Sequence, residues 1–160
     1  MLYSLEMAIP VQSTGNTRQP AGYDELVTAG QQLDDVLAEE TGTGADAWCL
    51  RLGAAAEATY AAIDTHRSGA EGPDGALADI LVRKPALAFH AERQRREHAE
   101  LYHRAKELSE EIERQLAFGE TDPEVLRLEA LVLRESLRLH VYRAVSLLYE
   151  AYFRDEGGED

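Results

Sequence analysis

The chain has 160 residues, with 16 Lys or Arg against 30 Asp or Glu, and its formal charge at pH 7 is −14. This length is enough for one domain with an ordinary hydrophobic core, which needs no disulfide or metal merely to fold. The acidic charge repels the phosphates of nucleic acids and anionic lipid heads. We therefore expect neither nucleic acid nor a membrane surface as a partner.

Cysteine content and the start of the chain bear on the compartment. Cys49 is the single cysteine, which excludes an intrachain disulfide and a zinc site made only of thiolates. The apolar stretch 1–11 carries no basic residue and is about half as long as a membrane span. We expect a cytoplasmic protein. The sequence also lacks a phosphate-binding loop, a dinucleotide fingerprint and a serine elbow, so we expect a binding protein rather than an enzyme.

Apolar residues recur at helical spacing along most of the chain, and no segment shows the alternation of a strand. Glycine, proline and small polar residues separate the periodic segments. The pattern predicts four long helices, over about 22–40, 46–68, 85–118 and 123–154. A short helix over about 76–84 precedes Pro85 and is expected to cap one end of the fold.

Four amphipathic helices with short connections predict an all-α protein, an up-down-up-down four-helix bundle over 21–156. Asp46 is the predicted N-cap of the second helix, and Thr121 or Asp122 that of the last. Residues 1–20 have no periodicity and predict a flexible arm, and 157–160 form an acidic tail. The rival is a three-helix core with the first helix loosely attached.

Three histidines fall on the core-facing stripes of three different helices, namely His66, His98 and His140. Counted from one end of the bundle at a rise of ~1.5 Å per residue, their heights are roughly 32, 30 and 26 Å. The three imidazoles are therefore expected to converge at one level. His90 and His103 lie off the stripes and are expected at the surface.

Imidazoles and carboxylates that project inward from facing helices are the usual way for a helical bundle to hold iron, manganese or zinc. Glu71, five residues after His66, is the best-placed carboxylate. The alternative is that each histidine is a core residue whose ring forms a hydrogen bond with a tyrosine, with Gln94 or with a backbone carbonyl.

Three stretches resemble the hemerythrin-like, cation-binding four-helix family: REHAEL around His98, the segment from His66 to Glu71 that leads into GPDG, and LRLHVYRAV around His140. The resemblance covers about 22–158. It implies a non-haem iron centre that acts in oxygen or nitric-oxide binding, redox sensing or iron handling, with His66, Glu71, His98 and His140 as metal ligands. The first helix contains no histidine, so the ligand set of the family's di-iron centre is incomplete. A single metal with an open position for a small diatomic ligand fits the remaining residues.

A second hypothesis is a metal-free helical bundle that has kept the fold and serves as a protein-interaction module. Four apolar residues flank the core stripe of the last helix and widen its apolar arc: Leu139, Val141, Val145 and Leu148. The wide arc suggests a protein partner or a homo-oligomer, or else a last helix that is the most buried element of the monomer.

Overall fold

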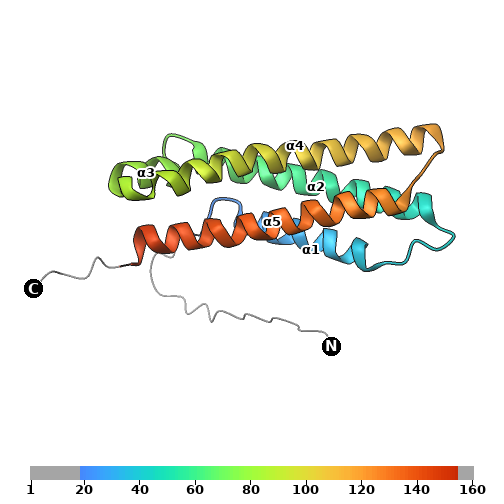
Figure 1. Ribbon diagram of the computed structural model, residues 1–160, viewed down its shortest axis with the longest axis horizontal. Helices are drawn as coiled ribbons and strands as arrows, with labels where there is room; N and C mark the ends of the chain where they lie inside the picture. Colours follow the sequence, from blue (N-terminus) through green and yellow to red (C-terminus); the bar gives the residue numbers. More distant parts are fainter. Residues whose placement is uncertain (1–18, 155–160) are drawn as a thin grey trace, which may run out of the picture.

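The computed structural model describes residues 19–154, which are helical and contain no strand. The elements in chain order are α1 (Tyr23–Ala38), α2 (Ala45–Glu71), α3 (Ala76–Arg83), the 3-10 turn η1 (Pro85–Leu87), α4 (Ala88–Phe118) and α5 (Pro123–Tyr152). The four long helices lie antiparallel in an up-down-up-down bundle, and α3 covers one end (Figure 1). This arrangement confirms the predicted all-α class and the capping helix.

The two predicted terminal segments lie almost wholly outside the described residues. The arm over 1–20 lies outside the described residues except for its last two, and the tail over 157–160 lies wholly outside them. Among residues 19–154, no helix combines the length and the apolar character that a bilayer crossing requires.

The long helices surround one large apolar cluster, to which α1 contributes Leu26, Ala29, Leu33 and Val36. The side chain of Trp48 on α2 donates a hydrogen bond from Nε1 to the carbonyl of Val36 at 3.0 Å. These contacts fix α1 in the bundle, so the four-helix interpretation is confirmed over the three-helix rival. A smaller cluster under α3 fills the capped end, and includes Leu77, Ile80 and Leu147.

Two helix ends differ from the prediction. The carbonyl of Gly44 accepts the first hydrogen bond of α2, from the amide of Trp48, so Gly44 is the N-cap and Asp46 lies inside the first turn. There the negative charge of Asp46 interacts favourably with the positive end of the helix dipole. At the other end, α2 continues through Gly69 to Glu71, about one turn beyond the predicted end at 68.

The start of α5 follows the sequence signals. Asp122 is its N-cap, and the carboxylate accepts a hydrogen bond from the amide of Val125 at 3.2 Å. Pro123 occupies the first helical position, where the missing amide hydrogen costs nothing. Pro85 likewise opens the turn η1 that leads into α4.

Candidate metal centre

His66 on α2, His98 on α4 and His140 on α5 meet inside the bundle, as the sequence predicted. Each is at most 2% exposed. One ring nitrogen from each residue lies within 4.8 Å of the other two, and the ring centroids are 4.8 to 5.2 Å apart. The cluster separates the large apolar core from the smaller one under α3. His90 and His103 are exposed, as expected.

The outer nitrogen of every ring, Nδ1, has a hydrogen-bond acceptor. His66 donates to the carbonyl of Ala21 at 2.6 Å, His98 to Glu71 Oε1 at 2.6 Å, and His140 to Glu97 Oε2 at 2.9 Å. A carbonyl or carboxylate oxygen can only accept, so the hydrogen of each ring sits on Nδ1 and a lone pair remains on Nε2. Proteins orient metal-binding histidines in this way.

The inner nitrogens lack matching donors. His66 Nε2 lies 3.1 Å from His140 Nε2, and His98 Nε2 is buried without a hydrogen-bond partner. Burial lowers the pKa of His66 to about 4 and also lowers the pKa of His98, although the hydrogen bonds that the rings donate to Ala21 and Glu71 oppose the shift. Both rings are therefore neutral at pH 7.

A metal ion satisfies this cluster better than a proton does. If Nε2 of His140 carried a proton, it could donate a hydrogen bond to Nε2 of His66, but Nε2 of His98 would still have no partner. A metal ion can accept all three lone pairs. Two nitrogens bound tetrahedrally at ~2.05 Å would be about 3.3 Å apart. The observed 3.1 Å between His66 and His140 is close to that value, and the third nitrogen, from His98, lies within 4.8 Å of both, so its ring would shift inward to share the ion. The donor set thus fits a metal ion.

Glu71 does not converge with the three inner nitrogens. It is the last residue of α2, its side chain is 31% exposed, and its carboxylate contacts the outer nitrogen of His98. This position orients the imidazole and favours its neutral Nδ1–H form. Direct ligation of a metal by Glu71 stays a prediction.

Glu97 is a site residue that sequence reasoning missed. Its carboxylate accepts from His140 at 2.9 Å and from Arg143 Nη1 at 2.5 Å. Burial alone would raise the pKa of Glu97, but His140 and Arg143 outweigh it and lower that pKa. Glu97 lies off the apolar stripe of α4, where Arg93 one turn earlier forms an ion pair with it at 3.6 Å, and the packing of α5 against α4 brings His140 and Arg143 to it. The spacing of His140 and Arg143, three residues apart, was the available signal.

The entry segment, residues 20–22, is the second feature that the sequence did not reveal. It crosses α2 so closely that a Cβ on Gly69 would lie 2.5 Å from Cβ of Ala21. Gly22 has φ +63°, and a Cβ there would lie 3.2 Å from the backbone nitrogen of His66. Two glycines therefore let the carbonyl of Ala21 reach the His66 ring.

A small cavity adjoins the cluster. Its volume is about 30 Å³, and His66 and His98 form part of its wall. Gln94 and apolar residues of α3 and α5, including Leu77 and Leu147, form much of the rest. A space of this size holds one or two molecules as small as water.

Comparison with known proteins leaves the family open, because no family model, curated protein or solved structure matches the chain. The likeness to hemerythrin-like proteins is therefore not confirmed. What stands is a four-helix all-α bundle with a buried cluster of His66, His98 and His140 that could hold a metal ion.

The lowered pKa of His66 predicts a pH dependence for the metal-free protein. Between pH 6.5 and about 4 the unfolded chain binds a proton that the folded state excludes, so stability falls as the pH decreases through this window. Above pH 6.5 this group has no effect. We expect a loss of about 3 kcal/mol from this residue, measured by urea unfolding in chelator at several pH values. His66→Phe should flatten the profile, whereas His90→Phe should not; equal profiles would contradict the prediction.

Proposed function

We propose that the protein binds one transition-metal ion through His66, His98 and His140. The observation that carries this proposal is the set of three inward lone pairs, each fixed by an outward hydrogen bond, with no donor among residues 19–154 that satisfies all three. Neutral imidazoles suit iron, zinc, copper and nickel. Iron is the metal that the resemblance to hemerythrin-like proteins implies, and we propose it as the resident ion.

The residues present support one ion rather than a pair. Three imidazoles converge, and α1 carries no histidine that could help to coordinate a second ion. Glu71 and Glu97 occupy the outer nitrogens of His98 and His140, where they hold the rings in place. A site with three protein ligands leaves coordination positions open, and this is the arrangement of metal sites that bind a further ligand.

The cavity beside the cluster suits a small neutral ligand such as oxygen or nitric oxide. The volume of about 30 Å³ excludes larger molecules, and the apolar residues Leu77, Ile80 and Leu147 exclude charged ones. Gln94 brings an amide that can form a hydrogen bond with a bound ligand. The metal would supply an open coordination position, and the chain supplies the amide that orients the ligand and the apolar side chains that exclude water. Ligand binding or sensing, rather than catalysis, is the proposed role.

Metal removal gives the direct test of the proposed function. A metal that binds only the folded state at 100 times its Kd stabilises that state by about 2.7 kcal/mol. This energy is expected to raise Tm by roughly 5–10 °C, and a chelator should reverse the shift in a thermal scan.

Elemental analysis of protein purified from iron-supplemented cells identifies the ion. We expect about one iron per chain and a visible absorption spectrum in air, whereas stoichiometric zinc would be colourless and would overturn the choice of iron. Less than about one metal per four chains, with Tm unchanged by chelator, would overturn the metal site itself.

A further inference from the structure

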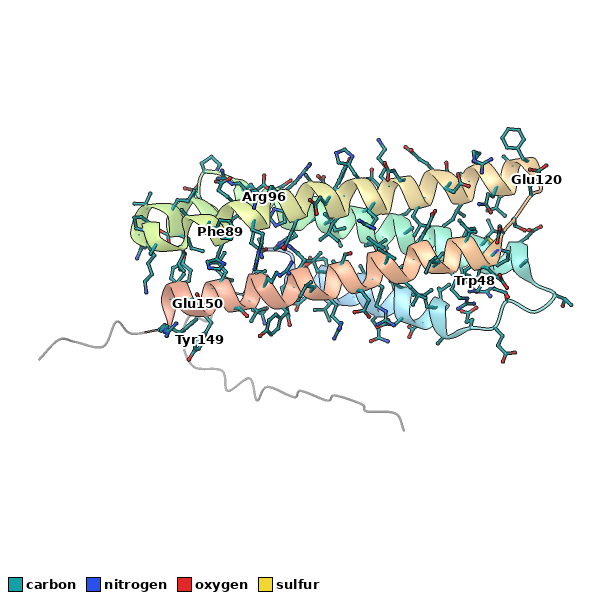
Figure 2. All side chains as sticks on the ribbon, viewed as in Figure 1. Trp48, Phe89, Arg96, Glu120, Tyr149 and Glu150 are labelled. Carbon is teal, nitrogen blue, oxygen red and sulfur yellow. The ribbon has the colours of Figure 1, made fainter. Side chains whose placement is uncertain are left out.

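The outer face of α5 is rich in exposed apolar side chains. Of the thirteen large apolar residues exposed in residues 19–154, eight lie on α5 or at its C-cap: Val125, Leu128, Val132, Leu139, Tyr142, Val145, Tyr149 and Phe153. Their exposed fractions run from 38% to 67%. Tyr149 lies on the side of α5 that faces away from α4 (Figure 2). Two other predicted members of the arc are not exposed, because Val141 packs on the large core and Leu148 lies in the smaller one.

Most of these residues follow a repeat of seven. Positions 125, 128, 132, 135, 139, 142, 146, 149 and 153 alternate in steps of three and four. Only Glu135 and Ser146 are polar among them. A stripe with this spacing is the seam of a coiled coil, in which a second helix packs along the first. The seam runs the whole length of α5 and has no partner among the described residues.

Charge singles out the same face for contact between identical chains. Helix α5 carries four arginines and four glutamates, whereas the whole chain carries −14. Two copies of an acidic protein repel each other most weakly where each presents a neutral surface. Of the four long helices, α5 is the one whose charges sum to zero, and it exposes the apolar seam.

We propose that two copies of the chain pair through α5 in an antiparallel, two-fold symmetric coiled coil. The register is set by the two polar seam positions, with Glu135 of each copy opposite Ser146 of the other. Apolar residues then oppose each other at three pairs of positions, 128 with 153, 132 with 149 and 139 with 142, while Val125 lies beyond the paired part of the seam. In other registers an apolar residue would cover the carboxylate of Glu135 and its ion pairs with Arg134 and Arg138, and the desolvation of these charges costs free energy.

The surface beside the seam fits this register. A groove of about 870 Å³ runs between α4 and α5, and Leu128 and Val132 line it together with charged residues of α4. The register places Phe153 and Tyr149 of the second copy opposite Leu128 and Val132. These two aromatic rings stack on each other with centroids 6.1 Å apart, and they are bulky enough to occupy the groove. A helix of this length offers roughly 40 Å of contact, which suits an interface near 800 Å² per copy.

Sedimentation equilibrium of the full chain tests the pairing. The wild type is expected to be a dimer at micromolar concentration, and Leu139→Glu/Tyr149→Glu a monomer with unchanged helix content by circular dichroism. The matched control is Leu50→Glu, which changes an apolar residue of α2 that is 63% exposed but lies outside the seam; it should remain a dimer. A wild type that stays monomeric to about 100 μM, or a double variant that dimerises like the wild type, would overturn the proposal.

Cross-linking tests the antiparallel register. Cys49 is fully buried, so cysteines placed on the seam are the reactive ones. Oxidation of Glu135→Cys/Ser146→Cys should give a covalent dimer, and Glu135→Cys alone should not, because the register separates the two copies of position 135 by about 16 Å. A cross-link in the single variant, or none in a dimeric double variant, would contradict the register. Neither experiment depends on metal, so its outcome is separate from that of the proposed metal site.

Discussion

Replacement of His98 by Ala is expected to abolish metal binding. His98 supplies one of three converging nitrogens, and its Nε2 is buried with no hydrogen-bond partner among the described residues. Loss of a residue that merely orients a ligand costs about 10–100-fold in metal affinity, and loss of a ligand should cost more than that. The measurement is calorimetric titration with Zn²⁺ and Fe²⁺, and His103→Ala, an exposed histidine on the same helix, is the control.

The response of stability to metal separates the two interpretations of His98. In chelator the variant should be less stable than the wild type in either case, because the ring is buried and bonded to Glu71. If the residue binds metal, only the wild type should gain stability when metal is added. If His98 is an ordinary core residue paired with Glu71, the variant should be less stable in both conditions and metal should change neither protein. This second pattern would contradict the metal assignment.

The bundle and the buried positions of the three histidines could be predicted from the sequence, because both leave a periodic signal. Leu26 and Leu33 repeat at helical spacing, as do the histidines within their apolar stripes. A polar residue on such a stripe must be buried, and a constant rise per residue places three of them at one height. Burial of His66, His98 and His140 therefore follows from the local pattern, and their convergence follows from that pattern together with the up-down-up-down topology.

The outer partners left no comparable signal because they depend on how separate elements pack. Glu97 reaches His140 only across the contact between α4 and α5, and its place off the apolar stripe is typical of a solvated residue. The carbonyl of Ala21 belongs to the backbone, which every residue has, so its role cannot be seen in the side chain. Gly69 resembles a helix terminator in sequence, yet α2 continues through it because its missing side chain admits the entry segment.

At Gly69, helix propensity favours a residue with a side chain, whereas the geometry of the site requires glycine. In a helix interior, Gly→Ala normally stabilises by about 1 kcal/mol. At Gly69, however, the new Cβ would lie 2.5 Å from Cβ of Ala21, so the entry segment must move away. Its carbonyl accepts from His66 Nδ1 at 2.6 Å, and this hydrogen bond is the only one that holds the outer side of the His66 ring among the described residues. We expect Gly69→Ala to lower metal affinity by about 10–100-fold.

Compensation at Ala21 distinguishes this mechanism from general damage to the fold. Ala21→Gly removes the opposing methyl group and keeps the carbonyl, so Ala21→Gly/Gly69→Ala should recover most of the wild-type affinity in a zinc titration. Gly53→Ala is the matched control on α2, since a Cβ there meets only Ile112 at 3.4 Å; its affinity should equal that of the wild type. If Gly69→Ala binds zinc as tightly as the wild type, or if the double variant stays as weak as the single one, the carbonyl of Ala21 does not position His66.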